Sequence, residues 1–151
     1  MVLAALAIAA GGAPGGTVTD GILRASLPGG WSGSVGFGKQ IVAGLPRTEA
    51  YILMANFPLA SDAATHEAQP VVPPHKLMIS LGDFVLTGRA VHWPRLQTLR
   101  LPENPTERRT VSWHGRFAGR AVWVTVSFGS KPSARSRALV DGVLASVRRV
   151  R

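Results

Sequence analysis

One glycine-rich segment has the spacing of a phosphate-binding loop. Gly33, Gly38 and Lys39 match the G-x4-G-K part of a P-loop, in which backbone N–H groups hold phosphate and the lysine reaches the terminal phosphates. Gln40, however, stands where a Ser or Thr should bind magnesium, and Pro46 stops any following helix after about two turns. The pattern therefore favours a glycine-rich strand with a bulge over a nucleotide site.

Residues that could act as acids, bases, nucleophiles or metal ligands are few and widely spaced. The four histidines are His66, His75, His92 and His114. No two of them have i,i+4 helical spacing, and no H-E-x-x-H motif occurs. The absence of cysteine excludes disulfides, thiol nucleophiles and Cys-ligated metals. Pro105 keeps Glu103 and Glu107 from sharing a regular helix face. We therefore predict no catalytic residue, no cofactor and no metal site.

A hairpin over residues 110–128 is the clearest structural element. If Ala118 and Gly119 form a two-residue turn, Phe117 pairs with Arg120 and Trp113 pairs with Val124. That register collects nearly every large apolar group on one face: Val111, Trp113, Phe117, Val122, Val124, Val126 and Phe128.

The opposite face of this hairpin is the candidate binding surface. His114 is expected opposite Trp123, with Arg116 diagonal to that indole. An exposed aromatic beside arginine can hold a base, a sugar or an anionic polymer. The competing interpretation is that the terminal helix or the loop at 58–74 covers Trp123 as a second core. The tripeptide Trp-Pro-Arg at 93–95 is a similar but weaker candidate.

Strand patterns precede this hairpin, and one helix follows it. The earlier strand segments are 22–27, 31–37, 50–57 and 77–84, of which 50–57 is apolar enough for a central strand. The pattern also allows one short helix at 61–68 and at most one edge strand near 96–101.

Ser133 is the expected N-cap of the closing helix. Its apolar face comprises Leu139, Val140, Val143, Leu144 and Val147, and Arg148 and Arg149 lie in or beyond its last turn. The order predicts an α+β fold, a mostly antiparallel β-sheet with a C-terminal α-helix packed on one face. The alternative is a β-sandwich or small barrel with a terminal helix.

The amino-acid composition limits which class of protein the chain can belong to and which partners it can attract. With 151 residues and 46% hydrophobic residues, the chain can form one domain with a core. Lys and Arg number 17 against 8 Asp and Glu, a formal net charge of +9 that attracts anions. Arginine outnumbers lysine by 14 to 3, which the composition of a GC-rich genome also explains.

The first residues resemble part of a signal peptide. Residues 1–10 are uninterruptedly apolar and small residues follow, with an A-x-A pattern at Ala7 and Ala9, although no Lys or Arg comes first. This run is shorter than the roughly 20 residues of a membrane span. We expect residues 1–16 to be a signal-peptide remnant or disordered leader and 17–151 a single domain. The expected location is exported, secreted or in the cell envelope, with the cytoplasm as the alternative.

Three short motifs resemble a known family. The segment Leu27-Pro28-Gly29-Gly30-Trp31 is similar to the LP-x-GW turn after the first strand of PsbP-like domains. The hairpin at Gly119-Arg120 and the helix end Leu144-Ala145-Ser146-Val147 also resemble that family and uncharacterised exported domains of high-GC bacteria. The resemblance implies a mostly antiparallel sandwich that serves as an accessory or binding module without catalytic residues. The stretch 33–38 and the weak pattern after Thr87 depart from the family.

These observations support three hypotheses. The favoured one is a non-catalytic exported domain that binds a partner protein or an anionic envelope polymer. The second is a hydrolase-type enzyme, which requires a pocket where His75, His92 or His114 meets a serine or carboxylate. The third is nonspecific nucleic-acid binding through arginine, since no motif for sequence-specific readout occurs.

Overall fold

The larger of two antiparallel sheets organises the fold. In the computed structural model of the chain, the described residues are 16–37, 47–60, 63–65, 70–85, 93–102 and 109–151. The strands of the larger sheet are β3 (Ser32–Gly36), β4 (Arg47–Ala55), β5 (Leu77–Val85), β6 (Thr110–Phe117) and β7 (Arg120–Phe128). Their order is β3-β4-β5-β7-β6, and every neighbouring pair is antiparallel.

A smaller sheet joins the two ends of the described chain. It contains β1 (Gly16–Thr19), β2 (Leu23–Leu27) and β8 (Arg148–Arg149) in the order β1-β2-β8. The sequence pattern predicted β2, whose Leu23, Ala25 and Leu27 are buried on one face. It missed β1 and β8, and Arg148 and Arg149 pair with β2 instead of extending the helix end.

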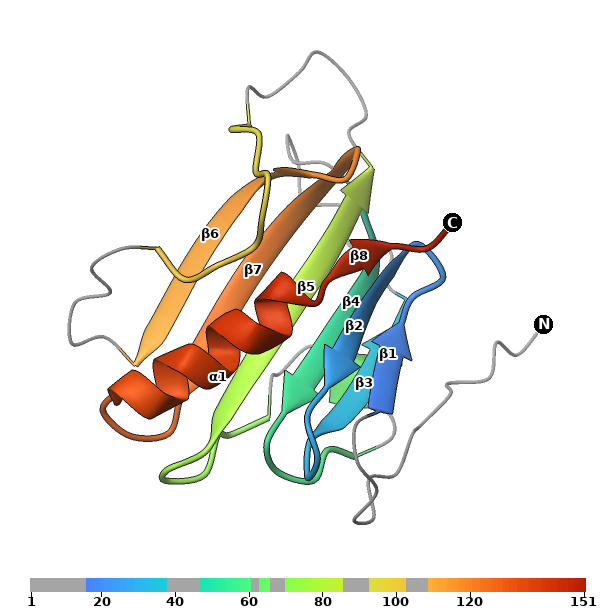
Figure 1. The fold of residues 1–151 in the computed structure, drawn as a ribbon. Helices are drawn as coiled ribbons and strands as arrows, with labels where there is room; N and C mark the ends of the chain where they lie inside the picture. The colour runs from blue at the N-terminus through green and yellow to red at the C-terminus, as the bar shows by residue number, and fades with distance from the viewer. Residues whose placement is uncertain (1–15, 38–46, 61–62, 66–69, 86–92, 103–108) are drawn as a thin grey trace.

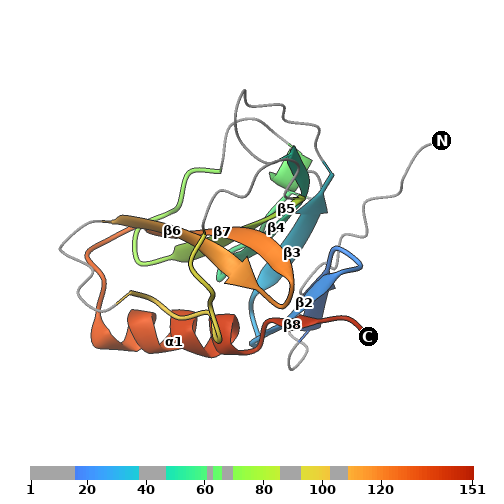
Figure 2. The same cartoon turned by 90° about the horizontal axis from the view of Figure 1, so that it is seen from above.

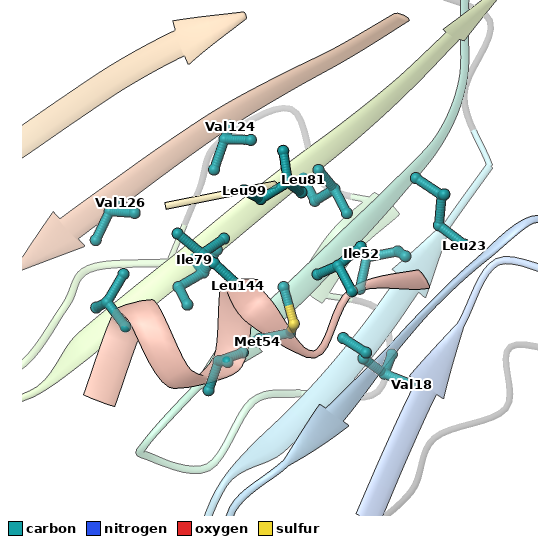
Figure 3. Close-up of a cluster of buried hydrophobic side chains, with 14 of the residues drawn as sticks. Val18, Leu23, Ile52, Met54, Ile79, Leu81, Leu99, Val124, Val126 and Leu144 are labelled. Carbon is teal, nitrogen blue, oxygen red and sulfur yellow. The ribbon is translucent and has the colours of Figure 1, made fainter. Parts of the chain in front are cut away.

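The molecule has two layers. The helix α1 (Ala134–Ala145) runs across one face of the larger sheet, and the smaller sheet lies beside it on the same side (Figure 1; Figure 2). The hydrophobic core fills the space between these layers and contains side chains from both sheets and α1 (Figure 3). Ile52, Ile79 and Leu81 contribute from the larger sheet, Leu23 from the smaller sheet and Leu144 from the helix. Among the described residues, no helix is long and apolar enough to cross a membrane.

This arrangement confirms an α+β fold of mostly antiparallel sheet with one C-terminal helix. The barrel alternative is wrong, because the two sheets do not close on each other. The predicted hairpin register is confirmed, with Phe117 opposite Arg120 and Trp113 opposite Val124. Ser133 caps α1 as predicted, through a reciprocal capping box with Ser136.

Several finer predictions need correction. Leu139 is 37% exposed, because the buried stripe of α1 consists of Val140, Val143 and Leu144. The expected helix at 61–68 is, in its described part, a single 3-10 turn, η1 (Ala63–Thr65). The glycine-rich strand exists as β3, but its pairing with β4 has continuous register and no bulge from Ser32 to Gly36.

The P-loop pattern is explained by packing. Gly33 lies within β3, where an added Cβ would come within 3.0 Å of the Val18 side chain. The first glycine of the pattern thus allows β1 to approach β3. Gly38, Lys39 and Gln40 lie outside the described residues.

The edge of β6 is covered by a short parallel segment. Arg95 forms an isolated parallel bridge with Arg116, and the N–H of Leu96 donates to the Arg116 carbonyl over 2.8 Å. The sequence pattern allowed at most one edge strand near 96–101, and the edge pairing of the described residues lies at 94–96. The Leu101 N–H is bound by Asp141 Oδ1 of α1 at 2.8 Å. The covering segment thus links the sheet edge to the helix.

Gly115 makes this edge coverage possible. A Cβ at this position would lie 2.5 Å from Leu96 Cγ and 2.7 Å from the Pro94 carbonyl oxygen. We expect Gly115→Ala to destabilise the fold by about 1–3 kcal/mol, because the backbone of the covering segment must shift. Chemical denaturation monitored by circular dichroism measures this loss.

Gly142→Ala is the matched control. Gly142 lies in α1 with open space around its missing Cβ. Alanine there should stabilise the protein by roughly 0.5–1 kcal/mol through helix propensity. Equal stability of the Gly115→Ala variant and the wild type would contradict the close contact with Leu96.

Candidate functional site

The candidate site begins at a tight turn between β6 and β7. Ala118 and Gly119 have φ angles of 50° and 80°, the left-handed pair that a type I′ hairpin turn requires. This turn matches the right-handed twist of the flanking strands and sets their register. His114 therefore lies opposite Trp123, and Arg116 lies opposite Ala121.

Three aromatic rings form a cluster on the outer face of the sheet. The imidazole of His114 lies close to both indoles, with its ring centroid 4.6 Å from that of Trp93 and 5.3 Å from that of Trp123. The two indoles are 6.4 Å apart with a 72° angle between their planes. These separations are those of favourable aromatic contacts. The structure thus brings the weaker candidate at 93–95 next to the predicted surface.

The terminal helix does not cover Trp123, which was one form of the competing interpretation. Helix α1 lies on the opposite face of the larger sheet, as Figure 2 shows. Trp123 remains 38% exposed, whereas Trp93 is only 7% exposed. Trp93 is therefore the buried member of the aromatic cluster, and Trp123 presents part of its ring to solvent.

Two arginines lie next to this aromatic cluster, on the same chain segments as Trp93 and His114. The bridge between Arg95 and Arg116 sets their backbones directly opposite each other, two residues along from Trp93 and His114. Both side chains are exposed, and neither forms an ion pair with a described residue. Like charges directly opposite each other on neighbouring strands destabilise a sheet. Fold stability therefore does not account for this pair.

A groove lies beside the aromatic cluster and the two arginines, at the hairpin turn. Its volume is about 840 Å³, and its described lining residues are Trp93, Arg95, Leu96, Gln97, Arg116, Ala118 and Gly119. Two guanidinium groups and one amide provide hydrogen-bond donors, and the indole provides an apolar wall. No described lining residue is acidic. The groove is thus suited to an anionic ligand with a flat or ring-shaped part.

The remaining candidates do not assemble into a recognisable catalytic or metal site within the described residues. His75 shares a smaller cavity of about 340 Å³ with Ser130 and Ser133. There the His75 backbone N–H, not its imidazole, donates to Ser130 Oγ over 2.9 Å. No three potential metal ligands come together in the described part of the chain. His66, His92, Glu103 and Glu107 lie outside it.

One charged contact near the hairpin was missed by the sequence analysis. Arg120 Nε donates to Asp83 Oδ1 over 2.8 Å, on the inner face of the sheet. The residues are 37 positions apart, so no local pattern indicates their contact. This pairing distinguishes Arg120 from the exposed arginines at 95 and 116.

Comparison with known proteins adds no identification. No protein-family model matches the chain, and neither a curated protein nor a solved structure matches it.

Replacing each tryptophan with alanine should distinguish the buried Trp93 from the partly exposed Trp123 by the stability that is lost. We expect Trp93→Ala to destabilise the protein by about 3 kcal/mol, as for a buried aromatic. Trp123→Ala should cost only about 1 kcal/mol, because its ring makes mainly cross-strand contacts. Urea denaturation of both variants measures the difference. An equal loss in both would mean that Trp123 belongs to a second core.

Proposed function

We propose that the chain is a non-catalytic exported domain that binds an anionic polymer of the cell envelope. The binding site is the hairpin surface, defined as Trp93, Arg95, His114, Arg116 and Trp123. The observation that carries this proposal is the bridge that sets Arg95 opposite Arg116 without a described acidic partner. An anionic ligand between the two guanidinium groups would relieve their repulsion and accept their hydrogen bonds.

The chemistry of the groove favours a sugar-containing polymer. Gln97 can exchange hydrogen bonds with hydroxyl groups, while Arg95 and Arg116 can bind carboxylate, sulfate or phosphate. The exposed face of Trp123 can pack on the apolar face of a sugar ring. The two indoles are tilted by 72°, so they do not form a stack of parallel platforms for successive bases. A charged polysaccharide therefore fits better than single-stranded nucleic acid.

The proposed export rests on residues 1–16. Their apolar run followed by small residues has the composition of a signal-peptide core and cleavage region. A basic domain delivered to the envelope would meet anionic polymers at high local concentration. The location and the ligand are therefore mutually consistent parts of one proposal.

Dextran sulfate is a suitable probe, with neutral dextran as the polymer control. The double variant Arg95→Gln/Arg116→Gln should bind it about tenfold or more weakly than the wild type, measured by titration calorimetry. The slope of log affinity against log salt should fall by about one per arginine removed. Trp123→Ala should weaken binding without changing that slope, because the indole carries no charge.

The double variant Arg24→Gln/Arg135→Gln makes the same change of charge elsewhere. Both arginines are exposed, on β2 and α1 of the other layer. Equal weakening by this pair would show that binding follows net charge and would contradict a site at the hairpin. Tighter binding of single-stranded DNA than of dextran sulfate would replace the polysaccharide with nucleic acid.

Export is tested by the fate of the N-terminus. When the gene is expressed with its native upstream region, we expect cleavage between Ala7 and Ala13 and recovery of the mature domain outside the cytoplasm. Cell fractionation and N-terminal sequencing measure this outcome. An intact N-terminus on a cytoplasmic protein would contradict the envelope location while leaving the binding measurements valid.

A further inference from the structure

A buried carboxyl group lies on the inner face of the larger sheet. Asp83 belongs to β5 and is only 1% exposed. Its Oδ1 accepts a hydrogen bond of 2.8 Å from Arg120 Nε on β7. A buried carboxylate requires such a charged partner. The arrangement satisfies one oxygen of Asp83 and leaves Oδ2 buried without a hydrogen-bond partner.

A second carboxyl group is fixed by the turn between β1 and β2. Asp20 Oδ1 accepts the backbone N–H groups of Ile22 and Leu23 over 2.8 and 2.7 Å. This local bonding is typical of aspartate in a turn. Asp20 Oδ2 is also buried without a donor. Asp20 and Asp83 thus share one pattern, in which Oδ1 is satisfied and Oδ2 is not.

The two carboxyl groups act on each other. Burial is the main cause that raises the pKa of Asp83 from 3.8 to about 6, and the charge of the Asp20 carboxyl raises this pKa further. The Arg120 guanidinium opposes this shift. Two carboxylate oxygens are both acceptors, so a hydrogen bond between them requires a proton on one of them.

We propose that Asp20 and Asp83 share one proton between their Oδ2 atoms, forming a pH-sensitive link between the β1–β2 turn and the larger sheet. The proton converts two buried acceptors into one short, charge-assisted hydrogen bond. The pair then carries a single negative charge, which Arg120 balances. Loss of the proton leaves two carboxylates facing each other with one guanidinium.

Within the described residues, the neighbouring elements supply no further charged group to this pair. The described groups that act on the Asp83 carboxyl are Arg120 from β7 and Asp20 from the β1–β2 turn. On β4, the residue paired with Asp83 is Ala50. From β8, Arg149 is directed to the hairpin turn, where its guanidinium donates to the Ala118 carbonyl over 3.3 Å. The proton is therefore the missing donor.

The raised pKa of Asp83 determines how the stability of the fold changes with pH. Between pH 3.8 and about 6, the folded protein keeps a proton that the unfolded chain has largely released. The contribution of the pair to stability is fully present below this window. It declines as the pH rises through the window and is lost above about pH 6. The ratio of folded to unfolded protein should fall by roughly a hundredfold across it from this pair alone.

Asp20→Asn is the decisive variant. The side-chain carbonyl oxygen of the introduced asparagine can still accept the two turn N–H groups, and its NH₂ group supplies a donor to Asp83 at every pH. We expect the decline in stability between pH 4 and 6 to flatten and the variant to exceed the wild type in stability at pH 7. Urea denaturation at successive pH values measures both effects.

Asp141→Asn provides the matched control. Asp141 Oδ1 also binds a backbone N–H, that of Leu101, over 2.8 Å, and its other oxygen is not among the buried atoms without a partner. This variant should keep the wild-type decline between pH 4 and 6. An Asp20→Asn profile that also keeps the decline would overturn the shared proton.

Carbon-13 NMR of the carboxyl groups tests the wild-type protein directly, even where a variant folds poorly. The chain has only four aspartates, so their Cγ resonances can be separated. The Asp83 resonance should show a titration step near pH 6. Complete ionisation of Asp83 by pH 5 would contradict the proposal.

Discussion

The whole arrangement depends on removing one broad apolar sheet face from water. Five strands at a spacing of about 4.8 Å span roughly 20 Å, whereas a helix is about 10 Å wide. Helix α1 alone is therefore too narrow to cover the larger sheet. The smaller sheet occupies the remaining width, and the core contains side chains from all three parts. Gly33 permits this fit, because the Val18 side chain occupies the space of its missing Cβ.

The opposite face of the larger sheet is covered only in part. Phe57 and Leu59 pack with buried residues of β4 and β5 there, so this half is closed by apolar contacts. At the other half, the segment at 94–96 pairs with the edge of β6. An uncovered edge strand invites association with other chains. The pairing that covers the edge of β6 also brings Trp93 and Arg95 beside His114 and Arg116. Protection of this edge and formation of the hairpin surface therefore depend on the same contact.

The elements predicted from sequence were those determined by local signals. The hairpin register follows from a two-residue turn and alternation, and Ser133 caps α1 through a residue three positions away. The smaller sheet depends on pairing between Arg148 and Arg24, which are more than a hundred residues apart in the sequence. The two residues of β8 are too few to show the alternation that indicates a strand. Leu139 was wrongly predicted to be buried, because helical spacing indicates which side of a helix is apolar but not how wide its buried part is. For the site, His114 and Trp123 were found together, whereas the contribution of Trp93 required tertiary pairing.

Genome composition can explain how many arginines the chain has, but it does not explain where they lie. Arg120 is oriented toward a buried carboxylate, which the fold must neutralise. Arg149 donates to a backbone carbonyl at the hairpin turn. Arg95 and Arg116 form no ion pair with a described residue and lie opposite each other, where like charges repel. Composition alone gives no physical reason for two arginines to lie opposite each other on paired segments. A pair held together by a backbone bridge beside an aromatic cluster concentrates positive potential at one groove, which favours the binding of an anion.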